Sequence, residues 1–172
     1  HRACAGYHGC MSTERWKPNV TVAAVIEHVG RFLLVEEETR EGLRLNQPAG
    51  HLEQGESLLA AVTREAREET GHHFTPRSVV GLYLWRADTG TTFLRVAFCG
   101  EAKPPQGTPQ LDDGIVGYHW LSREQIVKRT AQLRSPTVLR CLDDYLAGRR
   151  YPLECLTYLE PAALAGRQAA HG

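Results

Sequence analysis

Residues 57–70 constrain the fold most, because neither glycine nor proline interrupts a run rich in Ala, Leu, Arg and Glu. This composition favours an α-helix. Gly71 follows directly and suits the left-handed conformation that ends many helices. We therefore predict a helix over 57–70. At about 100° per residue, one face of this helix is an apolar arc. The arc consists of Leu58, Leu59, Val62 and Ala66.

The acidic residues of this helix do not lie opposite the apolar arc. Glu69 falls inside the arc, Glu65 falls at its edge and Glu68 lies on the adjoining side, whereas Arg67 points away. Carboxylates aimed at a core are unfavourable unless cations or donors meet them. A hard divalent ion with oxygen ligands meets this need, so we expect Mg²⁺, with Mn²⁺ as a substitute. The alternative is a solvated helix with local pairs such as Arg64 with Glu68, and the inward placement argues against it.

The stretch GHLEQGESLLAAVTREAREETG, residues 50–71, has a spacing that resembles the Nudix box, G-x5-E-x7-R-E-U-x-E-E-x-G-U with U aliphatic. All seven fixed positions match. A chance match has a probability of about 10⁻⁹ per starting point, at about one in twenty per position. The resemblance implies a hydrolase of phosphoanhydride bonds with an α/β (α+β) fold, in which a mixed β-sheet is sandwiched between helices. Its only departure within the box is His72, at the last aliphatic position.

The resemblance also implies roles for the box residues. Glu68 and Glu69 would bind metal, helped by the backbone carbonyl of Gly50, and Glu65 would bind metal or act as general base towards water. Glu56 and Arg64 would orient these carboxylates. We accordingly expect Arg64, Glu65 and Glu68 to be catalytic. Many relatives carry a further acidic metal ligand in a later loop. Asp112 and Asp113 are the nearest candidates here, and we take Asp113 as the expected ligand.

Charge and apolar content exclude several classes of protein. Lys+Arg and Asp+Glu number 20 each, so no global positive field would hold a nucleic-acid polymer. No apolar run approaches the roughly 20 residues needed to cross a bilayer, so we expect a cytoplasmic protein with no membrane partner. The five cysteines are an odd number without a C-x-x-C pair, which favours reduced thiols.

The rest of the chain predicts a single domain over residues 16–160. Residues 1–15 are expected to be a flexible extension and 161–172 a disordered tail. Apolar runs at 20–26 and 32–35 predict a β-hairpin, and the polar run 40–47 predicts a loop. We expect further strands at 79–85, 92–99, 115–120 and 153–159. A long loop is expected at 103–114, a capped helix from Ser122 and another helix at 137–146.

Outside the box, runs such as LNQPAGHLEQGESL and LRSPTVLRCLDDYLAGRRYPLE resemble bacterial phosphatases of the same family. That resemblance covers residues 16–154. It implies small-molecule substrates: nucleoside tri- and diphosphates and hydroxymethylpyrimidine pyrophosphate. Leu45 stands where those phosphatases have tryptophan, so one aromatic able to stack on a base is missing.

Five residues are candidates for binding substrate. Arg44 and Asn46 precede the box and would either reach the mouth of the site or belong to a plain loop. Trp85 ends a strand and would either stack on a base or complete the core. Arg95 would either clamp phosphate oxygens, as would Arg86, or face solvent.

Two other functions remain open at this stage. One is hydrolysis of another nucleoside diphosphate derivative, such as ADP-ribose, a nucleotide sugar or an oxidised nucleotide. The other is a nucleotide-sensing module that has lost catalysis. The presence of Glu65, Glu68 and Glu69 argues against that loss. The family resemblance implies a monomer or a homodimer.

Overall fold

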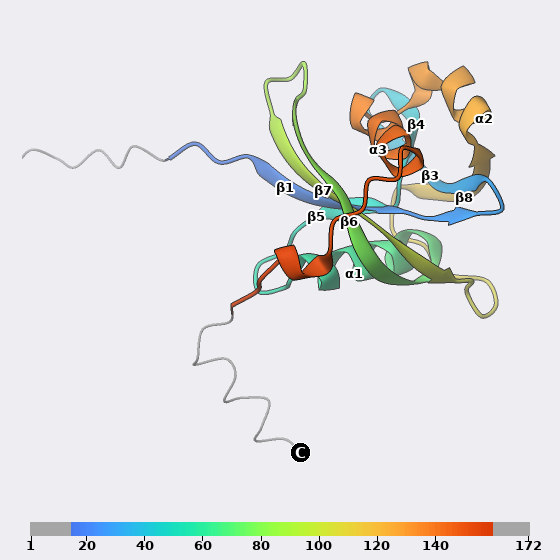
Figure 1. The fold of residues 1–172 in the computed structure, drawn as a ribbon. Helices are drawn as coiled ribbons and strands as arrows, with labels where there is room; N and C mark the ends of the chain where they lie inside the picture. Colours follow the sequence, from blue (N-terminus) through green and yellow to red (C-terminus); the bar gives the residue numbers. More distant parts are fainter. Residues whose placement is uncertain (1–14, 160–172) are drawn as a thin grey trace, which may run out of the picture.

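The computed structural model describes residues 15–159 (Figure 1). The extension expected at 1–15, Arg15 apart, and the tail expected at 161–172 lie outside the described residues. The elements, in chain order, are β1 (Asn19–Val25), β2 (Glu27–His28), β3 (Arg31–Thr39), β4 (Gly42–Asn46), β5 (Ala49–His51), α1 (Leu58–Thr70), β6 (His73–Arg86), β7 (Thr92–Lys103), β8 (Ile115–Ser122), α2 (Arg123–Lys128) and α3 (Pro136–Leu146), with 3-10 turns at Thr130–Gln132 and Leu153–Cys155.

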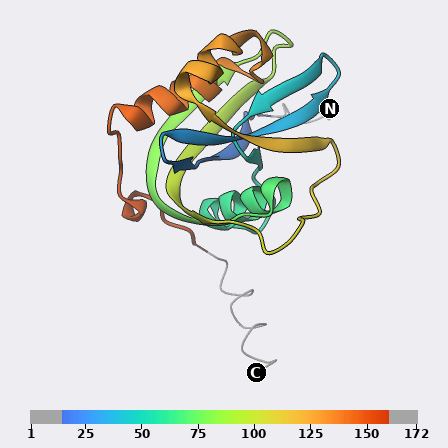
Figure 2. The same cartoon turned by 90° about the vertical axis from the view of Figure 1, so that its right-hand side faces the viewer.

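The strands form two sheets. The first has the order β5-β1-β7-β6, with β1 parallel to β7 and antiparallel to β5. In the second sheet β3 pairs with β2, β4 and β8. Helix α1 covers one side of this arrangement, and α2 and α3 cover the other (Figure 2). The expected mixed sheet between helices is therefore confirmed.

Two hydrophobic cores fill the spaces between the helices and the strands. On β1, Val22 and Ala24 pack in the core that contains α1, whereas Ala23 and Val25 pack in the core that contains α2 and α3. Adjacent side chains of a strand point to opposite faces, so a strand covered on both sides needs an unbroken apolar run. The run VAAVI, which ends β1 and includes Ile26 after it, meets this need.

The expected hairpin between 20–26 and 32–35 is wrong. β1 lies inside the first sheet, and the chain crosses to the second sheet at Ile26. Only Glu27 and His28 pair with β3, through a turn at Val29 and Gly30 whose φ angles are both positive. A double-sided apolar run fits a central position between two strands better than one arm of a local hairpin.

The loop expected at 40–47 is also wrong. β4 forms there as an edge strand, with Asn46 opposite Val35 and Gly42 opposite Thr39. Backbone pairing with β3 makes this strand, and few of its side chains are buried, so its apolar pattern is weak. β5, after Pro48, was not expected either, and it brings Gly50 beside Val22 of β1.

The helical expectations hold. Ser122 caps α2 in a capping box with Gln125, and α3 begins at Pro136 after Ser135. β6 and β7 are longer than expected, because register shifts near Pro76 and Val79 let the strands continue past these positions. The long loop follows Lys103 as expected.

The strand expected at 153–159 is wrong. Pro152 precedes these residues, and the 3-10 turn Leu153–Cys155 forms where the strand was expected. Tyr151 alone pairs with the sheet, through two backbone hydrogen bonds to Val79 of 2.8 and 2.9 Å. Among the cysteines of the described chain, Cys99 and Cys141 are buried and free, as expected of reduced core thiols. No helix in residues 15–159 is long and apolar enough to cross a membrane.

Candidate active site

Helix α1 presents its acidic residues as the sequence predicts. Ser57 accepts a hydrogen bond from Ala60 N of 3.1 Å at the start of the helix, and Gly71 ends it with φ of 71°. Between these caps, Glu65 is 7% exposed and Glu69 is 8% exposed. The glutamates are thus held at the inner side of the helix by the packing of its apolar face.

Strand β5 supplies the surface that these glutamates meet. Ala49 N donates a hydrogen bond of 2.8 Å to Glu69 Oε2. A Cβ atom added to Gly50 would overlap the carboxylate of Glu65. Glycine is therefore required at position 50, because any side chain would displace Glu65 from the backbone of β5.

Arg64 links the remaining box residues. Its guanidinium donates to both carboxylate oxygens of Glu56, at 2.7 and 3.1 Å. It also donates to Glu65 Oε1 at 2.7 Å, to Glu68 Oε2 at 3.1 Å and to the carbonyl of His51 at 3.1 Å. Such a bidentate pair with Glu56 fixes the plane of the guanidinium. Arg64 in turn fixes the positions of Glu65 and Glu68.

The electrostatics of the buried acids favour a cation. Burial raises the pKa of Glu69 to about 8, helped by the charges of Glu65, Glu37 and Asp112 and opposed by the Ala49 N–H. Burial also raises the pKa of Glu65, although Arg64 opposes this shift. Partly buried carboxylates that repel one another are stabilised by a positive charge placed between them.

Of the two later acids, the structure brings Asp112 to the cluster. Asp112 N donates a hydrogen bond of 3.0 Å to Glu68 O, and its charge acts on both Glu65 and Glu69. Both residues are exposed, but Asp113 forms no hydrogen bond or ion pair with the described box residues. Asp112 is therefore the better placed candidate for an acidic ligand outside the box.

Within residues 15–159, no three His, Cys, Asp or Glu side chains converge closely enough to hold a metal ion as they stand. Arg64 Nη1 donates to one oxygen of Glu65 and to one oxygen of Glu68, so each carboxylate has one oxygen already bonded. The donors nevertheless fit a hard ion, since Glu65, Glu68, Glu69 and the Gly50 backbone all offer oxygen.

A pocket of about 690 Å³ adjoins Gly50. This volume lies within the range of about 300–1,000 Å³ that is common for small-molecule sites. Of the expected substrate residues, Asn46, Trp85 and Arg95 line the pocket, and Arg44 does not. Arg44 instead pairs with Glu41 at 3.3 Å.

Arg95 is buried in the pocket wall and does not face open solvent. Its guanidinium donates to Gln47 Oε1 at 3.0 Å and to Asn46 Oδ1 at 3.1 Å. Gln47 is fixed by its own bond of 2.7 Å to the carbonyl of Val138. No carboxylate among the described residues lies within ion-pair distance of Arg95, so this cation is oriented by neutral amides. Burial lowers its pKa.

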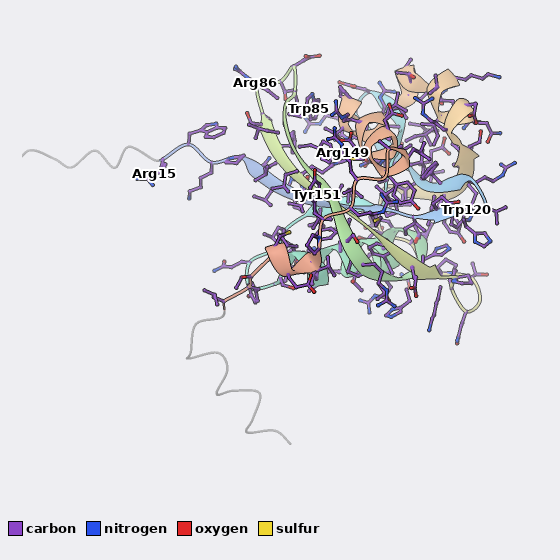
Figure 3. All side chains as sticks on the ribbon, in the orientation of Figure 1. Arg15, Trp85, Arg86, Trp120, Arg149 and Tyr151 are labelled. Carbon is purple, nitrogen blue, oxygen red and sulfur yellow. The ribbon has the colours of Figure 1, made fainter. Side chains whose placement is uncertain are left out.

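An aromatic surface lies at one end of the pocket. Trp85 stacks on Phe93, with ring centroids 5.6 Å apart and planes inclined by 20°. The ring of His51 lies near Phe93, with ring centroids 6.3 Å apart. Trp85 is half-buried at the β6–β7 hairpin, where the neighbouring Arg86 is exposed near the tip (Figure 3). Trp85 and Phe93 both line the pocket.

Sequence reasoning missed Phe93, Gln47 and Glu37, all of which belong to this site. Phe93 is placed by the strand register, which sets it opposite Trp85. Glu37 lies in an acidic run after the apolar part of β3. Neighbouring residues of a strand face opposite sides, so Glu36 and Glu37 must point in opposite directions. That rule is the only sequence signal that distinguishes Glu37 from Glu36.

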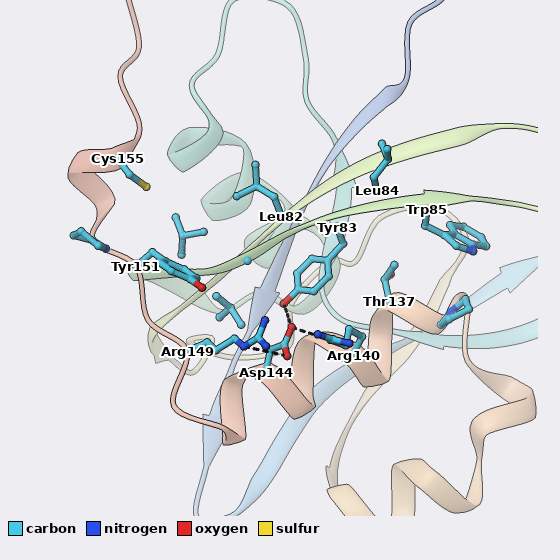
Figure 4. Close-up of a pocket in the computed structure, with 15 residues that line it drawn as sticks. Leu82, Tyr83, Leu84, Trp85, Thr137, Arg140, Asp144, Arg149, Tyr151 and Cys155 are labelled. Atoms are coloured by element: carbon cyan, nitrogen blue, oxygen red, sulfur yellow. Dashed lines mark hydrogen bonds and ion pairs between the residues drawn. The ribbon is translucent and has the colours of Figure 1, made fainter.

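A second hollow of about 710 Å³ adjoins the first, and Figure 4 shows the side chains that line it. Asp144 of α3 lies there between three donors. It accepts from Tyr83 Oη at 3.1 Å and from Arg140 Nε at 3.0 Å, and Arg149 Nε lies 3.5 Å away. This cluster fastens α3 to β6, and Tyr83 and Trp85 separate it from the pocket beside Gly50.

The fold and the box geometry define a family, and comparison with known proteins agrees with it. A family model described as NUDIX domain matches residues 16–141, and the chain belongs to this family. It is thus a Nudix hydrolase, an enzyme that acts on acid anhydrides in phosphorus-containing compounds.

Individual relatives cover most of the chain. Phosphatase NudJ from Shigella boydii is 42% identical over 141 residues, which are 82% of this chain and 92% of the relative. A NUDIX hydrolase structure from Nitrosomonas europaea is 50% identical with a TM-score of 0.81, covering 83% of this chain and 98% of its own. A MutT protein from Methanosarcina mazei is 26% identical with a TM-score of 0.62, covering 78% and 98%.

Proposed function

We propose that this enzyme uses Mg²⁺ to cleave phosphoanhydride bonds in nucleoside tri- and diphosphates, and also in hydroxymethylpyrimidine pyrophosphate. One observation carries the proposal: two buried box glutamates of α1 meet the backbone of β5 beside Gly50, and Gly50 also lines the pocket of about 690 Å³. A polyphosphate would lie over the glutamates while the organic group fills the pocket. The likeness to phosphatase NudJ supports this choice of substrates.

The metal would be held by oxygen donors of the box. Glu68, Glu69 and the Gly50 carbonyl are the proposed ligands, with Asp112 favoured over Asp113 as a further acid. When bound, Mg²⁺ supplies charge neutralisation for phosphate oxygens and lowers the pKa of coordinated water. Mn²⁺ would substitute, since it accepts the same ligands.

The chain's own residues perform the other tasks. Glu65 is the proposed general base, because its carboxylate lies at Gly50 and only one of its oxygens is bonded to Arg64. Arg64 keeps Glu65 and Glu68 at a fixed separation while Glu56 holds Arg64. Such positioning matters because proton transfer requires hydrogen-bond distance between the base and the attacking water.

The pocket supports recognition of an aromatic group with an anionic chain. Trp85 and Phe93 offer a stacking surface, and Arg95 places a positive charge in the wall without a carboxylate partner. Stacking on aromatic side chains is tolerant of ring type. Other nucleoside diphosphate derivatives, such as ADP-ribose or a nucleotide sugar, would need a pocket for a second group. No contact of the described residues selects one of these derivatives.

A panel of phosphoanhydrides tests the proposal. Nucleoside tri- and diphosphates, hydroxymethylpyrimidine pyrophosphate and ADP-ribose are incubated with Mg²⁺ or with excess chelator, and orthophosphate and pyrophosphate are measured separately. With Mg²⁺ we expect turnover of the nucleoside triphosphates, the nucleoside diphosphates and hydroxymethylpyrimidine pyrophosphate. With excess chelator we expect none. Undiminished turnover in chelator would refute the role of the metal, and a preference for ADP-ribose would refute the substrate class.

Two variants make the same experiment specific to the box. Glu68→Gln keeps the shape of the side chain but removes its charge, so we expect turnover to fall by roughly 10²-fold or more while the circular dichroism spectrum is retained. Glu53→Gln is the matched control, because Glu53 is an exposed acid of the loop before α1. Equal turnover in the two variants would remove Glu68 from the site.

A further inference from the structure

Glu37 is an acidic residue of the pocket that takes no part in the proposed metal binding or proton transfer. It lies on β3, its side chain is 21% exposed, and it lines the same pocket as Arg95, Trp85 and Phe93. A half-buried carboxylate in a ligand pocket is unfavourable unless its oxygens find donors. The hydrogen bonds of Glu37 therefore indicate which donor a ligand in the pocket would supply.

Both donors that hold Glu37 use the same oxygen. Asn46 Nδ2 donates to Glu37 Oε1 at 3.4 Å, and Arg134 Nε lies 3.3 Å from that oxygen. Glu37 Oε2 forms no hydrogen bond or ion pair with any residue of the described chain. No fully buried side-chain oxygen or nitrogen in this part of the chain lacks a partner, so Oε2 is accessible, and Glu37 lines the pocket. It is an acceptor without a donor.

Asn46 holds Glu37, the acceptor, beside Arg95, a donor. Its Oδ1 accepts from Arg95 at 3.1 Å while its Nδ2 donates to Glu37. The amide orientation is thereby fixed by both neighbours. A guanidinium has five N–H donors, and the bonds to Gln47 and Asn46 use only part of them. The wall therefore presents a donor, Arg95, next to an acceptor, Glu37, with Asn46 as the positioning residue.

We propose that Glu37 makes this enzyme select substrates whose ring carries an amino group next to an unprotonated ring nitrogen, as in cytosine and other 4-aminopyrimidines. The amino group donates to Glu37 Oε2, the ring nitrogen or the adjacent oxygen accepts from Arg95, and the ring stacks at Trp85 and Phe93. This inference rests on the proposed function and names the base that the same site prefers.

Other bases fit this wall less well. Uracil places a carbonyl oxygen where cytosine has its amino group, and that oxygen would face the carboxylate of Glu37. Guanine offers two adjacent N–H donors, which a carboxylate reads best with both oxygens. Glu37 has only one open oxygen, because Asn46 and Arg134 occupy the other. Adenine has the required amino and ring-nitrogen pair but is larger.

The variant Glu37→Gln reverses the hydrogen-bonding character of the wall. Asn46 and Arg134 are both donors, so they will hold the glutamine oxygen and leave its amide nitrogen facing the pocket. An acceptor thus becomes a donor with almost no change in shape. Glu36→Gln is the matched control, since Glu36 precedes Glu37 on β3 and contacts His119, 3.3 Å away.

The experiment compares CTP with UTP. For the wild type we expect kcat/KM for CTP to exceed that for UTP by about tenfold or more, the usual scale for one base-reading contact. Glu37→Gln should reduce this ratio by about tenfold, and Glu36→Gln should leave it unchanged. A wild-type ratio near one, or a ratio that survives in Glu37→Gln, would overturn the inference.

Binding separates this inference from the proposed function. Titration calorimetry with CMP and UMP reads base recognition without turnover, and we expect the wild type, but not Glu37→Gln, to prefer CMP. If neither triphosphate is hydrolysed, the proposed function fails, and a CMP preference lost in Glu37→Gln still supports the inference. If both are hydrolysed and both monophosphates bind equally, the proposed function stands and the role of Glu37 is refuted.

Discussion

At the scale of single residues, His72 shows how a departure from the family pattern is accommodated. It stands at the last aliphatic position of the box and is 4% exposed. Its ring lies edge-on to Tyr118 and Trp120, with centroids 5.3 and 5.9 Å away, and Nδ1 lies 3.1 Å from Thr70 O. The imidazole thus fills the space of an aliphatic side chain in an aromatic setting.

This burial makes stability depend on pH. Burial lowers the pKa of His72 from 6.5, although Thr70 opposes the shift. The unfolded chain then binds the proton more tightly than the folded one, so stability is lost as pH falls through 6.5 towards the folded pKa. We expect His72→Leu to lose less unfolding free energy than the wild type between pH 7.5 and pH 5, in urea titrations. His73→Leu, at the exposed neighbouring position, should follow the wild type, and identical slopes for all three proteins would contradict the prediction.

Single residues of the site were predictable where local spacing places them. Glu65 and Glu69 point inward because the helical period and the apolar arc are both local. Glu37 and Phe93 were missed, because each reaches the pocket through strand pairing that joins distant parts of the chain. Asp112 and Asp113 are adjacent in sequence, and only the path of the loop separates them.

At the scale of elements, glycine determines how α1 ends. Gly71 has φ of 71°, and an added Cβ would overlap Pro109 of the loop that follows β7. Gly148, after α3, has φ of 80° with nothing within 4 Å of such a Cβ. We expect Gly148→Ala to lose about 1 kcal/mol of unfolding free energy from backbone conformation alone. Gly71→Ala should lose more, measured by guanidinium titration. Equal losses would mean that the loop yields to the added methyl group.

The elements also divide into predictable and unpredictable ones for a physical reason. The helices carry caps and periodic faces in their own sequence, so Ser57, Gly71 and Ser122 marked their ends. β4 and the central position of β1 depend on which strands lie alongside, and a one-dimensional pattern does not contain that partner. At residues 153–159 the apolar spacing suggested a strand, but no sheet edge accepts it beyond Tyr151.

At the scale of the whole molecule, the buried acids of α1 weaken the fold in the absence of a cation. Glu65 and Glu69 lie between α1 and β5, and Glu37 and Asp112 add repulsion at Glu69. Like charges in a partly buried site lower the stability of the folded state, and an ion that binds only this state restores it. The stability of the domain should therefore respond to Mg²⁺ even without substrate.

Thermal unfolding tests this coupling. At about a hundredfold excess of Mg²⁺ over its Kd, we expect Tm to rise by roughly 5–10 °C, from ~2.7 kcal/mol of linkage in a domain of this size. Above pH 8, where the Glu69 carboxyl is ionised in the folded state, Glu69→Gln should melt higher than the wild type without Mg²⁺, because one buried charge is gone, and should gain little when Mg²⁺ is added. Glu101→Gln is the control, because Glu101 forms an exposed pair with Arg77 at 3.2 Å. An equal Mg²⁺ shift in Glu69→Gln and Glu101→Gln would place the ion elsewhere on the molecule. If Mg²⁺ does not raise the Tm of the wild type, the buried charges are not coupled to metal binding.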